Sequence, residues 1–97
     1  INGITIARVR FTWDPRKATS NLRKHGVSFE EAATVFADPL ALAIEDILDP
    51  GRTLLLGMSE RLRVLLVVHV EVDADTVQLI SARRATSHER RRYEEGD

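Results

Sequence analysis

Two neighbouring side chains that can carry positive charge, Lys24 and His25, stand directly before Gly26 in the segment NLRKHGVSFEE. A glycine after residues with helical periodicity is typical of a helix end, where the backbone carries partial negative charge and cations are stabilising. Binding of an anion is the second explanation of the pair. Lys17, Asn21 and Lys24 have i, i+4, i+7 spacing and share one helix face. This row suits contact with a phosphate or a base edge, and it equally suits exposure to solvent.

A second group of polar residues lies in the segment 63–71, which alternates as a strand does. Its fully apolar side, which we expect to meet the helices, consists of Val64, Leu66, Val68 and Val70. Arg63, His69 and Glu71 then lie on the open face of the sheet. A histidine near a carboxylate suits general acid–base chemistry, and an arginine can stabilise a pentavalent phosphate. The alternative is that His69 is a half-buried strand residue and Glu71 marks the exposed end of the strand.

The last strand ends in arginine. Arg83 has the same parity as Val77, Leu79 and Ser81, so it projects beside the helices if those three residues face the core. Arg83 and Arg63 then share a site only where the sheet curls or a bulge shifts the parity. The final helix carries three consecutive arginines, of which at most two can contact one ligand. They are Arg90, Arg91 and Arg92.

Basic and acidic residues are concentrated in different segments of the chain, although the net charge is only −1. Of the 14 basic residues 12 are arginine, the side chain best suited to bidentate phosphate contact, and five of these lie between Arg83 and Arg92. The segment 38–49 carries four acidic residues and no basic one. One basic face toward RNA would explain this pattern, and so would an ordinary solvated surface.

Several classes of site are disfavoured. The chain of 97 residues has no cysteine, which excludes disulfides and thiolate sites and fits a reducing, cytoplasmic compartment. Its three histidines lack metal-ligand spacing, so neither a metal nor another cofactor is expected. No glycine-rich phosphate loop, helix-turn-helix pattern, secretion signal or membrane-length apolar run is present.

The periodicities predict one α+β domain over residues 1–97, with the order β-α-α-β-β-β-β-α. The first strand covers 4–13, with Trp13 in the core. Asp14 and Pro15 open a helix that Gly26 ends, with an apolar stripe of Ala18, Leu22 and His25. A capping box from Ser28 to Glu31 opens a second helix, which ends at 38–39. Four strands follow at 40–45, 53–59, 63–71 and 76–83, and a last helix covers 86–93. Short turns between these strands favour a mostly antiparallel sheet with the helices on one face.

Taken together, these segments resemble the BrnT family of toxins from type II toxin–antitoxin systems. The resemblance rests on FTWDPRKATSNLRKHGVSFEEAATVFADPLA, LLLGMS, RVLLVVHVE and LISARRATSHERRRYEE, which cover about 85 of the 97 residues in order. The family pattern usually has a glycine before the arginine of the third strand, where this chain has Leu62.

The resemblance implies a RelE-like fold, with two N-terminal helices against a curved sheet, and an endoribonuclease that arrests translation. It implies neutralisation by a BrnA-like antitoxin, whose ribbon-helix-helix domain would make the DNA contacts. RNA supplies its own nucleophile, the 2′-hydroxyl, so cleavage needs no metal. Lys24, His25, Arg63 and Arg83 match family motif positions. We expect Arg63 and Arg83 to stabilise the phosphate, His25 to move protons, and Lys24 to hold a phosphate.

The remaining candidates have supporting roles in this hypothesis. His69 and Glu71 are the reserve acid–base pair, and the expected RNA contacts are Lys17, Asn21, Arg84 and Arg90. Two alternatives are a non-catalytic partner of a ribbon-helix-helix regulator and an RNA-binding module without cleavage.

Overall fold

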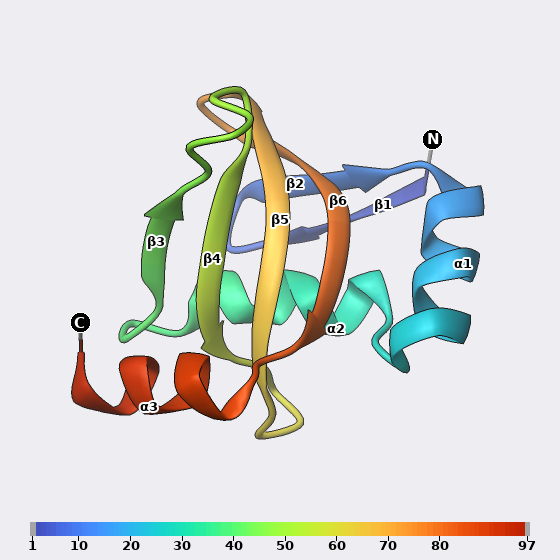
Figure 1. The fold of residues 1–97 in the computed structure, drawn as a ribbon. Coiled ribbons are helices and arrows are strands. Elements are labelled where there is room, and N and C mark those ends of the chain that lie inside the picture. The colour runs from blue at the N-terminus through green and yellow to red at the C-terminus, as the bar shows by residue number, and fades with distance from the viewer. Residues whose placement is uncertain (1, 97) are drawn as a thin grey trace.

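The computed structural model describes residues 2–96 (Figure 1). In chain order the elements are β1 (Asn2–Ile6), β2 (Val9–Trp13), α1 (Pro15–His25), α2 (Phe29–Thr34), a 3-10 turn η1 (Val35–Ala37), β3 (Leu42–Glu45), β4 (Thr53–Met58), β5 (Val64–Asp73), β6 (Thr76–Arg84) and α3 (Ser87–Glu95). The six strands form one sheet in the order β1-β2-β6-β5-β4-β3. Only the β2–β6 pair is parallel. The predicted α+β class with a mostly antiparallel sheet is confirmed.

The N-terminal strand differs from the prediction. Residues 4–13 do not form one strand, because the chain reverses at Ala7 and Arg8 and makes the antiparallel hairpin β1–β2. Both turn residues have left-handed backbones, with φ of 50° and 71°. Two-residue hairpin turns of this kind usually carry asparagine or glycine. Positions 7 and 8 are alanine and arginine, so the sequence did not indicate a turn there.

The helix boundaries follow the predicted caps. The carboxylate of Asp14 accepts a hydrogen bond from the backbone N–H of Arg16, and Gly26 ends α1 with φ of 68°. Such a backbone is easy for glycine and costly for other residues. The Ser28 hydroxyl caps α2 by accepting from the N–H of Glu31, and Thr86 and Glu89 form a complete capping box on α3.

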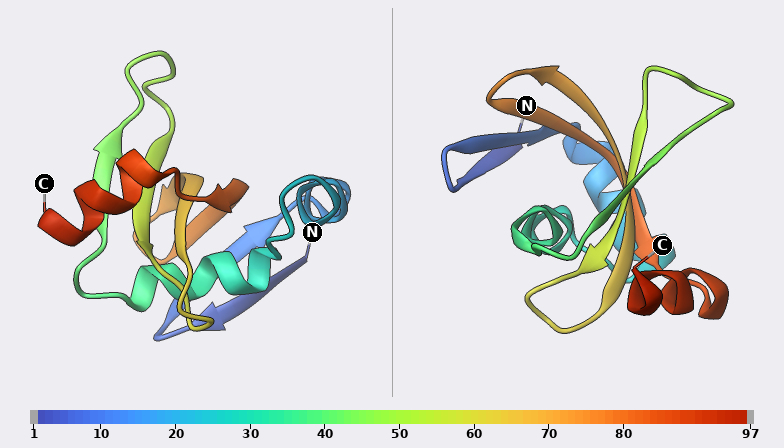
Figure 2. Two further views of the ribbon diagram at one scale, coloured as in Figure 1. Left: turned by 60° about the horizontal axis from the view of Figure 1, so that its bottom comes forward. Right: turned by 90° about the vertical axis from the view of Figure 1, so that its left-hand side faces the viewer.

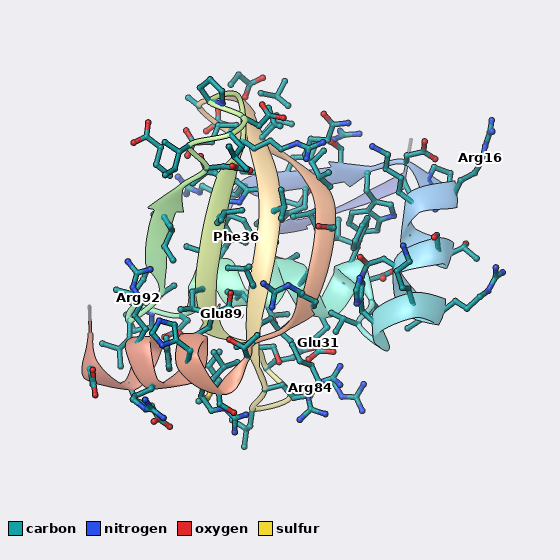
Figure 3. All side chains as sticks on the ribbon, viewed as in Figure 1. Arg16, Glu31, Phe36, Arg84, Glu89 and Arg92 are labelled. Carbon is teal, nitrogen blue, oxygen red and sulfur yellow. The ribbon has the colours of Figure 1, made fainter. Side chains whose placement is uncertain are left out.

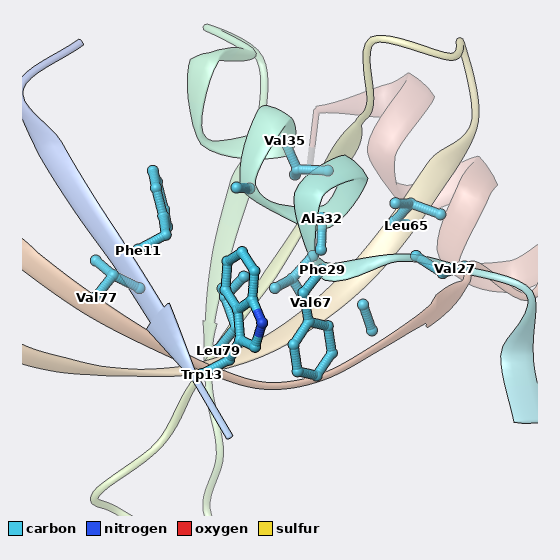
Figure 4. Packing of buried hydrophobic residues seen from close by; sticks show 12 residues of the cluster. Phe11, Trp13, Val27, Phe29, Ala32, Val35, Leu65, Val67, Val77 and Leu79 are labelled. Carbon is cyan, nitrogen blue, oxygen red and sulfur yellow. The ribbon is translucent and has the colours of Figure 1, made fainter. Parts of the chain in front are cut away.

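The main core lies between α2 and one face of the sheet (Figures 1 and 2). Trp13 packs edge-to-face on Phe29, with ring centroids 5.9 Å apart, and both are buried with Leu65 and Val67 (Figure 4). The predicted core position of Trp13 is confirmed. The predicted orientation of β5 is wrong: the residues with the parity of Leu65 and Val67 face α2, not those with the parity of Val64 and Leu66.

The three helices do not share one face, which corrects a second expectation. In Figures 1 and 2, α2 and α3 lie on opposite faces of the β3–β6 strands, and α1 lies beside the edge of β6. The stripe predicted for α1 is only partly right: Ala18 packs against the core, but Leu22 is 53% exposed and His25 is exposed. Asn21 points inward instead.

Gly57 allows the close approach of η1 to β4. A Cβ atom at position 57 would lie 2.8 Å from the Cβ of Ala41 and 2.9 Å from Cγ1 of Val35. Any side chain there would push η1 from the sheet. None of the helices within residues 2–96 is long and apolar enough to cross a membrane.

Candidate functional site

A buried ion pair fixes the arginine that begins β5. The carboxylate of Glu31, only 3% exposed, accepts hydrogen bonds from Nε and Nη2 of Arg63 and from the hydroxyl of Ser59. The hydrogen bond from Arg63 lowers the pKa of Glu31, although burial acts in the opposite direction. Arg63 is therefore a pre-oriented guanidinium, because its planar fork is matched on the carboxylate.

The same arginine reaches the end of α1. Nη2 of Arg63 donates to the carbonyl of Gly26 at 3.1 Å, and Gly26 directly follows Lys24 and His25. Arg63 thus contacts the backbone that directly follows the predicted helix-end pair. Lys24 and His25 are exposed and, with Lys17, line a hollow of about 180 Å³ against β6.

Arg83 does not share a face with Arg63. A bulge pairs Val68 with Ser81 and His69 with Leu79, which shifts the parity of β6 and turns Ala82 into the core. A bulge was one condition under which the two arginines could share a site, and it exists, but Arg63 is on the α2 face, so the sheet separates them. Arg83 instead binds Glu89 of α3 in a bidentate pair, at 2.8 and 2.9 Å. Each partner's hydrogen bond lowers the pKa of Glu89 and raises that of Arg83.

Three arginines from three elements surround a second pocket. Arg63 directly before β5, Arg84 at the end of β6 and Arg90 of α3 line a space of about 180 Å³, and Glu94 of α3 lines it with them. Figure 3 shows Arg84 and Glu31 at the lower end of the sheet, where α3 also begins. Among residues 2–96, Arg84 and Arg90 form no ion pair, unlike Arg63 and Arg83. The two guanidinium groups without an ion pair outnumber the one acidic lining residue, Glu94, so the pocket favours an anionic ligand.

Asn21 has a structural position. Its amide accepts from the N–H of Ala82 at 3.0 Å and donates to the carbonyls of Ala82 and Val27 at 2.8 and 3.0 Å. The side chain thereby completes the edge of β6 where β2 no longer pairs with it. Because the amide is buried and already hydrogen-bonded to the backbone, we do not include Asn21 among the RNA contacts of the proposed site.

His69 and Glu71 lie elsewhere, which corrects their predicted placement on the open face near Arg63. Positions 63 and 69 of an extended strand are roughly 20 Å apart. His69 is 3% exposed, packs edge-to-face on Phe36 with centroids 4.8 Å apart, and has an Nδ1 without a hydrogen-bond partner. Burial lowers its pKa, so the ring is neutral in the core. Glu71 is exposed at the opposite end of the sheet from Arg63.

Sequence reasoning missed Glu31 and Ser59 as parts of the site. Glu31 was assigned to a reciprocal capping box, but its carboxylate turns to Arg63 and Ser59 while only its N–H takes part in the cap. A glutamate at the third position of a capping box gives no sign of this choice. Among residues 2–96, no three histidine, aspartate or glutamate side chains are grouped as metal ligands would be.

Comparison with known proteins decides the family. The family model described as "Ribonuclease toxin, BrnT, of type II toxin-antitoxin system" matches residues 13–89, more than three quarters of the chain. The chain belongs to the BrnT family. The crystal structure of the Brucella abortus ribonuclease toxin BrnT superposes with a TM-score of 0.66 and 23% identity, over 79% of this chain and 96% of that one. No curated protein sequence matches.

For this BrnT chain, membership of a type II toxin–antitoxin family implies a protein antitoxin as partner. The matched segment includes Lys24, His25, Arg63 and Arg84 but stops before Arg90. The likeness to the Brucella toxin supports the fold of the sheet and its helices.

Proposed function

We propose that this BrnT toxin is a metal-independent endoribonuclease that uses the 2′-hydroxyl of RNA as nucleophile and arrests translation. The proposal extends to a RelE-like assignment of the fold, to a cytoplasmic location and to neutralisation by a BrnA-like ribbon-helix-helix antitoxin. The supporting observation is the bond from Arg63 to Gly26, which links the three-arginine pocket to the C-terminal end of α1, where Lys24 and His25 line a hollow of their own.

The proposed chemistry follows from what each group can do. Arg63 is held rigidly, so it can stabilise the extra charge of the pentavalent phosphate without reorganisation. Arg84 and Arg90 hold the adjacent phosphates. His25 is exposed at the helix end and moves the protons, from the 2′-hydroxyl or to the leaving 5′-oxygen. Arg83 receives a different role from the one expected: its pair with Glu89 positions α3 and therefore Arg90.

The proposal predicts that the purified protein cleaves single-stranded RNA in EDTA and leaves a 2′,3′-cyclic phosphate.

His25→Gln should lower the cleavage rate by at least about 100-fold, since general acid–base catalysis contributes about that much or more. Arg84→Gln should lower it about tenfold through lost charge stabilisation. Arg16→Gln, an exposed arginine near the opposite end of α1 (Figure 3), is the matched control and should cleave normally. Full activity of His25→Gln would remove that residue from the mechanism.

One observation favours a non-catalytic partner as the second candidate function. Arg63 and Arg83 are both neutralised by carboxylates, Glu31 and Glu89, as expected of arginines that only support the fold. In that case the protein leaves labelled RNA intact with and without ribosomes, while still binding its antitoxin. Cleavage that stops on addition of the antitoxin supports the toxin instead.

A further inference from the structure

The turn between β4 and β5 holds a leucine in a left-handed conformation. The N–H of Ser59 donates to the carbonyl of Arg63 at 2.8 Å, and the N–H of Leu62 donates to the carbonyl of Ser59 at 2.9 Å. These bonds close a three-residue hairpin loop whose last residue, Leu62, has φ of 62°. Glycine is the usual residue there, because a side chain is strained in this region.

The turn is fixed from a second side as well. The Ser59 hydroxyl accepts from the N–H of Arg61 at 3.2 Å and donates to the buried Glu31 carboxylate at 2.7 Å. Leu62 therefore has no freedom to relax, and the strain at its backbone is imposed by its surroundings. Strain of this kind persists where the surrounding structure determines it, and it often marks a functional site.

Burial of the Leu62 side chain does not offset the backbone strain. The side chain is 78% exposed, yet it lines the three-arginine pocket. The other apolar groups of that pocket are Met58, Val64 and Ala85. An apolar wall beside unpaired guanidinium groups matches a ligand that has a flat apolar surface next to an anion. A nucleotide of a single strand has this form, whereas a free phosphate gives the leucine nothing to contact.

We propose that Leu62 forms one wall of a nucleobase subsite, in which a base packs on the leucine while its phosphate meets Arg84 and Arg90. This inference rests on the proposed function, because it assigns the same pocket to one nucleotide of the RNA. It makes Leu62 a base-contact residue that this chain keeps at the expense of turn stability.

The test uses the full chain and a 2′-O-methyl oligonucleotide, which lacks the attacking hydroxyl, together with versions that carry one abasic nucleotide at successive positions. Binding is measured by fluorescence anisotropy. The unaltered protein should lose about threefold to tenfold in affinity at one abasic position, as expected for a partly buried leucine contact. Leu62→Asn keeps the side chain's size and tolerates the left-handed backbone. It should bind the complete oligonucleotide more weakly by a similar factor and no longer respond to the abasic change.

Two further variants separate contact from stability. Leu62→Gly should raise the thermal midpoint and weaken binding together, a combination that a purely structural leucine would not produce. Leu48→Asn is the control, because Leu48 is 97% exposed in a turn that does not line the pocket. It should bind like the unaltered protein.

The outcomes distinguish the two proposals. If Leu62→Asn keeps the affinity and the abasic sensitivity of the unaltered protein, or if Leu62→Gly lowers the midpoint, the subsite is wrong and RNA cleavage still stands. If the unaltered protein neither binds the oligonucleotide nor cleaves RNA, the proposed function and the subsite are both wrong.

Discussion

At the scale of single residues, two buried ionisable groups show opposite solutions to the same problem. The Glu31 carboxylate stays charged because it is fully hydrogen-bonded by Arg63 and Ser59. His69 forms no ion pair within residues 2–96, and burial lowers its pKa against the smaller opposing effect of the Glu71 charge, so the ring remains neutral. A buried charge without a partner is costly, and a group that can lose its charge does so.

His69 should make the fold sensitive to mild acid. Its pKa in the folded chain lies below the unfolded value of about 6.5, so the stabilisation is complete above pH 6.5 and is lost as the pH falls toward the folded pKa. The loss per pH unit is limited to about 1.4 kcal/mol, the slope for one proton. Urea unfolding at a series of pH values between 7 and 5 measures it.

His69→Leu, an apolar replacement of similar volume, should flatten this dependence. An unchanged slope in His69→Leu would assign the acid sensitivity to other groups. The carboxylates Glu31 and Glu89 contribute in a lower window, because their lowered pKa values make their stabilisation fall below about pH 4.5.

At the scale of elements, α3 is attached to the sheet mainly by polar contacts. None of its residues is buried. Glu89 holds its first turn to Arg83, and the hydroxyl of Tyr93 donates to the Asp38 carboxylate at 2.6 Å. Asp38 also accepts from the N–H of Met58 and so links α3 to β4. The position of Arg90 in the proposed site therefore depends on two hydrogen-bonded carboxylates.

The single tyrosine of the chain reports this attachment directly. The hydrogen bond to Asp38, followed by burial and the nearby charge, raises the pKa of Tyr93 to about 12. Ultraviolet titration of the phenol should give this value, and Asp38→Asn should bring it toward the ordinary value of about 10. The stabilisation by the neutral phenol is complete below pH 10 and disappears as the pH rises through 12. Titration near pH 10 with an intact fold, judged by circular dichroism, would mean that Tyr93 does not hold α3.

At the scale of the whole molecule, charge is divided between the two ends of the sheet. The β3–β4 and β5–β6 turns lie at the upper end in Figure 1 and carry or adjoin six acidic residues. These are Glu45, Asp46, Asp49, Glu71, Asp73 and Asp75. The proposed site lies at the lower end, where Lys24, Arg84 and Arg90 outnumber Glu94, whereas Arg52 pairs with only one of the six upper carboxylates, Asp49. A polyanion is repelled from one end and attracted to the other, so a net charge of −1 is compatible with RNA binding.

This division predicts a modest salt dependence of RNA binding. Three free cations at the site give a slope of roughly −2 for log affinity against log salt, at about 0.7 per phosphate of a single strand. The double variant Arg84→Gln/Arg90→Gln should reduce the slope to below about 1. Glu71→Gln, at the acidic end, should leave it nearly unchanged. Equal slopes for the unaltered protein and the double variant would place the phosphate contacts elsewhere.

Features that depend on neighbouring residues could be predicted from the amino-acid sequence. The caps at Asp14, Ser28 and Thr86, the stop at Gly26 and the strands from β3 to β6 were predicted because each relies on local backbone hydrogen bonds or on alternation. The hairpin at Ala7 was missed because its turn lacks the usual residues.

Which faces pack together could not be predicted, because it depends on contacts between distant segments. Both sides of β5 are apolar, so alternation alone did not say which one packs on α2, and one bulge opposite His69 reversed the face of Arg83. The helix periodicity placed Asn21 on a polar face, but its amide is buried because it exchanges hydrogen bonds with the backbone of Ala82, 61 positions along the chain. The Glu31 carboxylate likewise binds the distant Arg63 instead of a backbone N–H of its own helix cap. Contacts between distant segments depend on how the helices pack on the sheet, and the pattern of neighbouring residues does not determine that packing.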